Sequence, residues 1–287
     1  MHFPNLAPQP PLNPEADRYG DECLRRSAAV RPGQRGRFDV AFGPDPLQTL
    51  DVFLPKPEVR DAPVLLFMHG GGWTHGYKEW CGFMAPALNA RGIILVSGSY
   101  RLAPAAVYPA AVKDSIAALA WVKANIAGLG GSPDRLFVGG HSAGGQIAGL
   151  MALHPDWLAE AGLGPDTIKA AFCLSTTFHR LGITGTPGAG YALPPGPLQI
   201  EPESGLALLA NAGVPFHIGW GGRERQRERV ERSSMQLIGA LRDRNIRVGW
   251  TFFPEADHFS IHLDCEAAAN PWMREIGDWM LETPPGR

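Results

Sequence analysis

Six short apolar runs occur in the chain between residues 64 and 253. None of them shows the strict alternation of apolar and polar residues that is typical of a half-buried strand. Continuous apolar runs of this length are typical of strands that are buried on both faces of a mostly parallel sheet. We therefore predict a parallel core sheet whose strands contain residues 64–68, 93–96, 136–138, 170–174, 216–220 and 248–253.

Longer segments between and after these runs carry apolar residues at helical spacing. The predicted helices cover residues 110–127, 145–153, 230–242 and 267–281. In the third of them, Val230, Leu237 and Leu241 fall on one face, and the charged residues fall on the opposite face. Because helices and buried strands alternate along the chain, we predict an α/β fold with a mostly parallel, doubly wound sheet.

The chain before the first buried run has a different pattern. Residues 38–42 and 49–54 alternate apolar and polar side chains on either side of a proline-containing turn, which predicts two antiparallel strands at one edge of the sheet. Residues 1–36 are rich in proline and then in charge. We interpret them as an N-terminal arm, extended or loosely helical, that lies over a catalytic domain of residues 37–287.

One segment interrupts the alternation of strands and helices. Glycine and proline crowd together from about residue 178 to residue 204, between two of the predicted strands. Insertions at such a position commonly cover the binding site of an α/β domain. We therefore interpret residues 178–204 as a cap or lid segment.

The composition excludes several classes of protein. The chain has 287 residues, of which 45% are hydrophobic and 19% are charged, so it has enough apolar surface for a sizeable core and is not disordered throughout. Its formal net charge of -2 creates no long-range attraction to nucleic acid or to an anionic membrane. Because no run approaches about 18 apolar residues and the N-terminus lacks a signal-peptide pattern, we expect a cytoplasmic protein without a membrane partner.

The four cysteines point to no metal site and no disulfide framework. They lie far apart and share no CxxC or CxH spacing, which both zinc sites and redox motifs require. We therefore expect buried free thiols at Cys23, Cys81, Cys173 and Cys265.

A serine lies in the strand, turn and helix context of a nucleophile elbow. It follows the run 136–138 and precedes the helix 145–153, within the segment Gly140-His141-Ser142-Ala143-Gly144. A tight turn strains the serine backbone, and only small flanking residues avoid a collision with the neighbouring strand and helix. We therefore predict that Ser142 is a catalytic nucleophile.

A glycine motif upstream supplies backbone donors for the same chemistry. The segment His69-Gly70-Gly71-Gly72-Trp73 directly follows the run 64–68. Consecutive glycines let bare backbone N–H groups converge on a developing oxyanion. We predict that the N–H groups of Gly71, Gly72 and Ala143 form an oxyanion hole.

A histidine and an acidic residue complete the expected set. His258 follows the strand 248–253 on a loop at the carboxyl edge of the sheet, where a general base belongs. Glu224 follows the strand 216–220 in the position of the orienting acid, and Asp257 is the next candidate. Glu228 lies inside a helix and is explained by a surface pair with Arg232. The order Ser142, Glu224, His258 is the order of the α/β-hydrolases.

Aromatic residues near the predicted strand ends are candidates for a substrate pocket. Apolar and aromatic side chains commonly line such pockets, although aromatics at strand ends are core residues as often as not. The candidates are Trp73, Tyr77, Phe178, Trp220 and Phe259.

On these motifs the sequence resembles the hormone-sensitive-lipase-like esterases and the kynurenine formamidase (arylformamidase) branch of the α/β-hydrolase fold, over about residues 38–283. Residues 69–73, 100–104 and 108–114 are esterase-like. The segment 76–78 and the histidine before Ser142 are more similar to formamidases. The chain lacks the aspartate that formamidases usually place after the strand 170–174, so the branch is left open.

The resemblance implies a serine hydrolase that cleaves a small carboxylic ester or an N-formyl or aryl amide. Ser142, His258 and Glu224 would act through an acyl-enzyme intermediate, without a metal or an organic cofactor. The expected partner is a small-molecule ester or amide substrate, with no nucleic acid or membrane, and a homodimer is left open.

Other interpretations of the same residues differ in their chemistry. The first is an arylformamidase-type amidohydrolase in place of a carboxylesterase. The second is a catalytically silent ligand-binding protein on a hydrolase scaffold, against which the retention of both Ser142 and His258 argues. A metallohydrolase that uses His258, His262 and Asp264 is the third, and it lacks both a HExxH pattern and a third clustered histidine.

Overall fold

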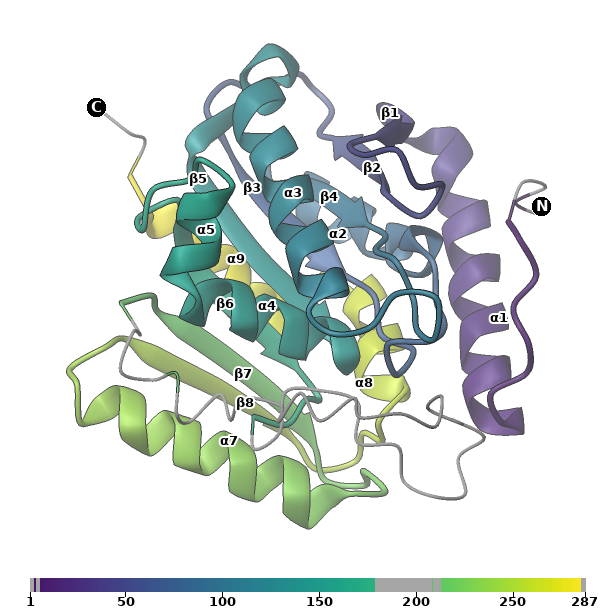
Figure 1. Ribbon diagram of the computed structural model, residues 1–287, viewed down its shortest axis with the longest axis vertical. Helices are drawn as coiled ribbons and strands as arrows, with labels where there is room; N and C mark the ends of the chain where they lie inside the picture. The colour runs from purple at the N-terminus through teal and green to yellow at the C-terminus, as the bar shows by residue number, and fades with distance from the viewer. Residues whose placement is uncertain (1–2, 4–5, 179–207, 209–212, 285–287) are drawn as a thin grey trace.

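The six predicted parallel strands and the two predicted edge strands form an eight-stranded sheet in the computed structural model, which describes residues 3, 6–178, 208 and 213–284 (Figure 1). The strands lie in the order β1-β2-β4-β3-β5-β6-β7-β8. Neighbouring strands from β4 to β8 are parallel, whereas β1 and β2 pair antiparallel at one edge, so the predicted architecture is confirmed. The strands are β1 (Arg35–Ala41), β2 (Thr49–Leu54), β3 (Ala62–Met68), β4 (Ile94–Gly98), β5 (Gly131–His141), β6 (Ile168–Leu174), β7 (Phe216–Gly221) and β8 (Val248–Phe253).

Helices cover both faces of this sheet. The larger are α1 (Pro14–Val30), α3 (Ala110–Asn125), α4 (Ala143–Leu153), α7 (Arg227–Arg242) and α9 (Pro271–Glu282). The shorter are α2 (Ala85–Asn89), α5 (Pro155–Glu160) and α8 (Ser260–Leu263), with 3-10 turns at Arg31–Gly33, Lys78–Trp80, Gly82–Met84, Ile126–Leu129 and Asp264–Glu266. The predicted helices correspond to α3, α4, α7 and α9 with small shifts of their ends.

The alternation of side chains along each strand separates two hydrophobic clusters. On β3, Val64 and Leu66 lie in one cluster with residues of α3, α4 and α7, whereas Leu65 and Phe67 lie in the other with residues of α1, α2 and α9. A strand that is buried on both faces needs apolar residues at successive positions, which explains the continuous run 64–68. Figure 1 shows α3 and α7 in front of the sheet and α9 behind it.

The last strand departs from the predicted burial on both faces. Trp250 and Phe252 on β8 are 42% and 40% exposed. Among the described strands, β8 pairs with β7 alone and ends the sheet, so one face of this strand is incompletely covered. The Arg242 guanidinium lies over the Trp250 ring, 4.5 Å from its centroid, and shields part of the exposed surface. The unbroken apolar run 248–253 predicts a strand that is buried on both faces. The structure corrects this prediction, because the run does not encode the place of the strand at the end of the sheet.

The N-terminal residues form a regular helix. Asn13 caps α1 by accepting hydrogen bonds from the N–H groups of Glu15 and Ala16, and Pro14 occupies the first helical position. Tyr19 and Cys23 bury one face of α1 in the cluster that also contains α2 and α9. The proline-rich start of the chain therefore leads into a well-capped helix that packs against the 3-10 turns Lys78–Trp80 and Gly82–Met84. The predicted cap, residues 178–204, lies outside the described residues except for Phe178.

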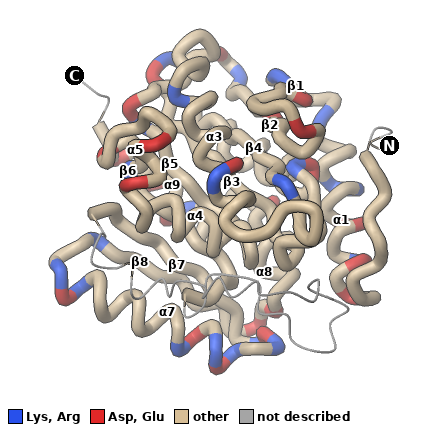
Figure 2. Tube along the Cα trace, in the orientation of Figure 1, with Lys and Arg blue, Asp and Glu red and all other residues tan. Residues whose placement is uncertain are grey.

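The charged residues do not gather into a face of one sign. Basic and acidic residues are interspersed over the helices and loops that the structure describes (Figure 2). Among these described helices, none has the length and apolar character that crossing a bilayer requires.

The crossing of β5 and α4 leaves room only for glycine. A Cβ atom on Gly144 would lie 2.0 Å from the carbonyl oxygen of Met68, and one on Gly140 would lie 2.2 Å from the carbonyl carbon of Gly144. These contacts involve backbone atoms, which cannot move aside as a flexible side chain can. The glycines next to Ser142 therefore let α4 start directly over the ends of β3 and β5.

We predict that Gly144→Ala lowers the free energy of unfolding by about 2 kcal/mol or more, because the new methyl group overpacks the crossing. The control is Gly239→Ala in α7, where a Cβ would meet nothing within 4 Å. That substitution should raise stability by up to about 1 kcal/mol, since alanine favours the helix. Urea unfolding of both variants tests this, and equal effects of the two substitutions would contradict the close packing at Gly144.

Candidate active site

Ser142 lies on a sharp turn between β5, which ends at His141, and α4, which begins at Ala143. Its backbone has φ 55° and ψ -118°, a conformation that costs a non-glycine residue free energy. Two hydrogen bonds hold the turn: the Ser142 N–H donates to the carbonyl of Leu174 at 2.9 Å, and the Ser142 carbonyl accepts from the N–H of Gln146 at 3.1 Å. The serine side chain is therefore presented at the carboxyl edge of the sheet.

The structure brings Ser142, His258 and Glu224 together from three different loops. His258 follows β8, and its Nε2 lies 2.9 Å from the Ser142 Oγ. Its Nδ1 lies 3.2 Å from Oε2 of Glu224, which follows β7. The side chain of Glu224 is 1% exposed and that of His258 is 30% exposed. A hydroxyl, an imidazole and a carboxylate thus lie in a line that runs from a solvent-accessible position into the protein.

The buried Glu224 carboxylate has enough partners to stay ionised. Besides His258, it accepts hydrogen bonds at Oε1 from the Ser175 hydroxyl at 2.6 Å and from the Gly221 N–H at 3.1 Å. Burial alone would raise the pKa of Glu224, but the hydrogen bond and charge of His258 and these two donors outweigh it, and the pKa is lowered. Sequence reasoning missed Ser175, whose position directly after β6 was the available clue.

The two other acidic candidates have different surroundings. Asp257 accepts the N–H groups of Phe259 and Ser260 at 2.9 and 2.7 Å, so it holds the turn that leads into α8. Glu228 is exposed in the first turn of α7. The contact with the Nδ1 of His258 is made by Glu224.

The glycine loop lies directly beside the serine. Gly71 and Gly72 have positive φ values of 112° and 61°, and the Gly71 carbonyl accepts the N–H of His75 at 3.0 Å. A Cβ atom on Gly70 would lie 3.2 Å from the Cβ of Ser142. Among the described residues, no acceptor takes a hydrogen bond from the N–H of Gly71, Gly72 or Ala143. The predicted oxyanion hole therefore consists of N–H groups that have no acceptor within the described part of the chain.

Residues 7–10 of the N-terminal segment lie along the end of this loop. The Gln9 amide makes two hydrogen bonds with the backbone of Gly76, at 3.1 and 2.8 Å. The Tyr77 hydroxyl donates to the carbonyl of Ala7 at 2.5 Å. These partners lie 67 to 70 residues away in the chain, so the sequence predicts an arm over the domain but not the groups that the arm contacts.

A cluster of charged side chains, buried except for Asp39, follows the loop. The Lys78 ammonium lies 2.6 Å from Asp39 and 2.9 Å from Asp51, and it also contacts Glu79. In the described part of the chain, these three acidic residues are the group whose ligand atoms lie close enough together to hold a metal ion. Burial lowers the pKa of Lys78, but the charges of Asp51 and Glu79 outweigh it, so the pKa is raised. A charged lysine therefore already contacts all three carboxylates, and Arg31 adds a second positive charge, 2.9 Å from Asp39 and 3.6 Å from Asp51.

The five aromatic pocket candidates lie in different surroundings. Phe178 and Trp220 belong to the hydrophobic cluster that contains α3, α4 and α7. Trp73 is 7% exposed and donates from Nε1 to Gln146 on α4 at 3.1 Å. Phe259 stacks on Tyr19, with ring centroids 4.7 Å apart, whereas Tyr77 contacts the N-terminal segment. The position of an aromatic residue at a strand end does not show whether its side chain packs in the core or lines a substrate pocket.

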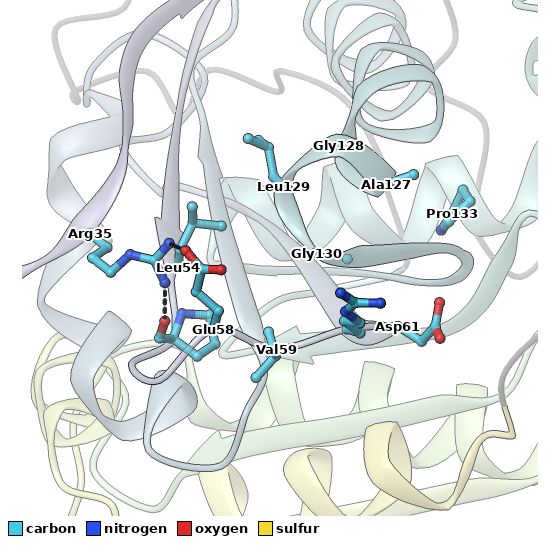
Figure 3. Close-up of a pocket in the computed structure, with 13 residues that line it drawn as sticks. Arg35, Leu54, Glu58, Val59, Asp61, Ala127, Gly128, Leu129, Gly130 and Pro133 are labelled. Carbon is cyan, nitrogen blue, oxygen red and sulfur yellow. Dashed lines mark hydrogen bonds and ion pairs between the residues drawn. The ribbon is translucent and has the colours of Figure 1, made fainter.

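A separate cleft lies at the opposite ends of the strands (Figure 3). It has a volume of about 550 Å³ and is formed by the segments 54–61 and 127–133 with Arg35. Arg35 donates to the carbonyl of Pro55 at 3.1 Å and to Glu58 at 2.6 Å. Ligands of open α/β sheets bind at the carboxyl ends of the strands, where Ser142 lies. We therefore expect the chemistry at the serine site and not in this cleft.

Known proteins that resemble this chain are named as esterases and as a kynurenine formamidase. The BD-FAE family model matches residues 50–161. Esterase LipC of Mycobacterium tuberculosis is 40% identical over 136 residues, which is 46% of this chain and 34% of LipC. The kynurenine formamidase of Danio rerio is 28% identical over 233 residues, which is 78% of this chain and 75% of the formamidase. The inhibited esterase B of Lactobacillus rhamnosis has the same fold, with a TM-score of 0.68, 17% identity and 93% of each chain covered.

The extent of these matches differs between the relatives. The chain spans about a third of the length of several curated esterase relatives, LipC among them, but three quarters of the formamidase. The chain has the α/β-hydrolase fold, and it is similar in sequence to proteins named as carboxylesterases and as a kynurenine formamidase.

Proposed function

We propose that this protein is a serine hydrolase that transfers the acyl group of a small carboxylic ester, or of an N-formyl aromatic amide, to water. The observation that carries the proposal is the continuous contact from the Ser142 Oγ through both nitrogens of His258 to the buried carboxylate of Glu224. Relatives named as esterases and as a kynurenine formamidase support the same reaction class.

The first half of the reaction forms an acyl-enzyme. His258 takes the Ser142 hydroxyl proton at Nε2 while Oγ attacks the carbonyl carbon. Glu224 stabilises the resulting imidazolium at Nδ1, since it stays ionised when buried. The N–H groups of Gly71, Gly72 and Ala143 donate to the oxyanion of the tetrahedral intermediate. The carbon–oxygen or carbon–nitrogen bond then breaks, and the leaving alcohol or amine takes the proton from His258.

The second half regenerates the serine. A water molecule gives a proton to His258 and attacks the acyl carbon, and the acid product leaves as Ser142 recovers its proton. The same groups serve both halves, so neither a metal nor an organic cofactor enters the scheme. Whether the bond that breaks is an ester or a formamide depends on the leaving-group side of the site.

We predict that the protein hydrolyses p-nitrophenyl acetate and butyrate or N-formyl aromatic amines, and that Ser142→Ala lowers kcat by at least about 1,000-fold on every accepted substrate. Ser115→Ala is the control, because it removes a buried hydroxyl in α3 that bonds only to the Ala111 carbonyl. Substantial residual turnover by Ser142→Ala would refute the proposed nucleophile. A preference for long-chain esters would contradict the small substrate, and the ratio of ester to formamide rates assigns the branch.

We predict that Glu224→Gln lowers kcat by about 1,000-fold or more, because the amide no longer stabilises the His258 imidazolium or holds its tautomer. Glu228→Gln removes the same charge from a nearby exposed position and should leave kcat within about twofold. Steady-state kinetics on the best substrate of the panel compares the two variants. Equal losses would show that the orienting acid lies elsewhere.

A further inference from the structure

A chain of hydrogen bonds connects the N-terminal helix with the loop that carries His258. Tyr19 on α1 is 5% exposed, and its hydroxyl lies 3.2 Å from Nδ1 of His141 and 2.7 Å from Nδ1 of His262. Nε2 of His141 in turn lies 2.7 Å from the backbone carbonyl oxygen of His258. None of these bonds takes part in the reaction scheme above.

The donors and acceptors along this row of hydrogen bonds can be assigned in one way. A carbonyl oxygen only accepts, so the His141 Nε2 must carry a proton. Burial lowers the pKa of His141 well below its usual value, which makes the ring neutral and its Nδ1 an acceptor. The Tyr19 hydroxyl then donates its one hydrogen bond to Nδ1 of His141, and its oxygen accepts a hydrogen bond from the Nδ1–H of His262.

The surroundings of His262 agree with this assignment. Burial lowers its pKa to about 3, so the ring is neutral and holds one proton. With that proton on Nδ1, the Nε2 is unprotonated, and it has no hydrogen-bond partner among the described residues. The His262 ring stacks on the rings of Phe67 and His141, with centroids 5.8 and 4.9 Å away.

We propose that Tyr19 is a positioning residue for the hydrolysis: its hydroxyl holds His141 in the one tautomer that donates to the His258 carbonyl, and thereby keeps the His258 ring in reach of Ser142. This inference rests on the proposed function. It makes α1 part of the support of the active site, although α1 lies outside the residues 50–161 that match the family model.

The contacts of the Tyr19 ring make a clean test feasible. The ring stacks on Phe259, the residue after His258, and meets Trp80 edge to face with centroids 5.4 Å apart. Tyr19→Phe keeps these ring contacts and removes only the hydroxyl. Without that donor, His141 can move its proton to Nδ1, which leaves two acceptors facing each other at the His258 carbonyl.

Tyr19→Phe should lower kcat by about tenfold, in line with the loss of one buried hydrogen bond, while KM stays within about twofold. Ser115→Ala should lower kcat by less than twofold, although it also removes a buried hydroxyl. If Tyr19→Phe keeps the wild-type kcat, or loses activity only in proportion to the folded fraction measured by circular dichroism, the positioning role is refuted.

A double-mutant cycle tests the route through His141. The amide of a glutamine keeps a donor near the Nε2 position and has no tautomers, so Tyr19→Phe should have no further effect on kcat in a His141→Gln background. Additive losses would overturn the proposal. Nitrogen-15 NMR of the histidine rings gives a readout that does not need the His141→Gln variant. Tyr19→Phe should shift the His141 ring away from a pure Nε2–H tautomer. Unchanged ring signals would contradict the inference.

Different results would refute the proposed hydrolase function and the positioning role of Tyr19. If Ser142→Ala retains turnover, the proposed function falls and the positioning role falls with it. If Ser142 is required but Tyr19→Phe behaves as wild type in both kcat and ring tautomers, only the positioning role falls.

Discussion

The strained turn at Ser142 is the constraint on which the site depends. With φ at 55°, the serine backbone is held only by its surroundings: the hydrogen bond from its N–H to Leu174 on β6 and the start of α4 directly after it. That start in turn requires glycine at positions 140 and 144, where any Cβ atom would collide with backbone. The same packing places the Ala143 N–H and the glycine loop beside the serine hydroxyl.

The carboxylate of Glu224 shows how the fold keeps a charge inside the protein. A buried ion without partners would take up a proton, but three donors from β6, the end of β7 and the His258 loop surround this one. The Ser175 hydroxyl directly follows β6, so a residue after one strand stabilises the Glu224 carboxylate, which follows the neighbouring strand β7. The histidines behind the site are buried and neutral by contrast, which keeps additional positive charge away from His258.

The functional motifs that could be predicted from the sequence are those whose residues are adjacent in the chain. The glycine loop, the serine turn and the His258 loop each lie within a few residues, and each follows an apolar strand, so their place at one sheet edge could be predicted. The position of Glu224 directly after a strand favours it over Asp257 as the orienting acid, but the contact that separates the two, from Glu224 to the Nδ1 of His258, is long-range and requires the structure.

The parts that sequence did not reveal depend on long-range contacts. Tyr19 lies 122 residues from His141 in the chain, and nothing local marks it as different from any other helix tyrosine. The exposure of β8 follows from its place as the last strand, which the apolar run 248–253 does not encode. Of the five aromatic candidates, Trp73, Phe178 and Trp220 are buried in one hydrophobic cluster, which their position at strand ends does not reveal.

The most direct measurement of the central claim is the site of covalent labelling by a small p-nitrophenyl phosphonate. A nucleophilic serine activated by His258 should take up one phosphonate per chain with release of p-nitrophenol, and peptide mass spectrometry should locate the adduct on Ser142. A catalytically silent binding protein on the same scaffold would not be labelled at this serine. An adduct on another residue, or none on the folded protein, would contradict the account.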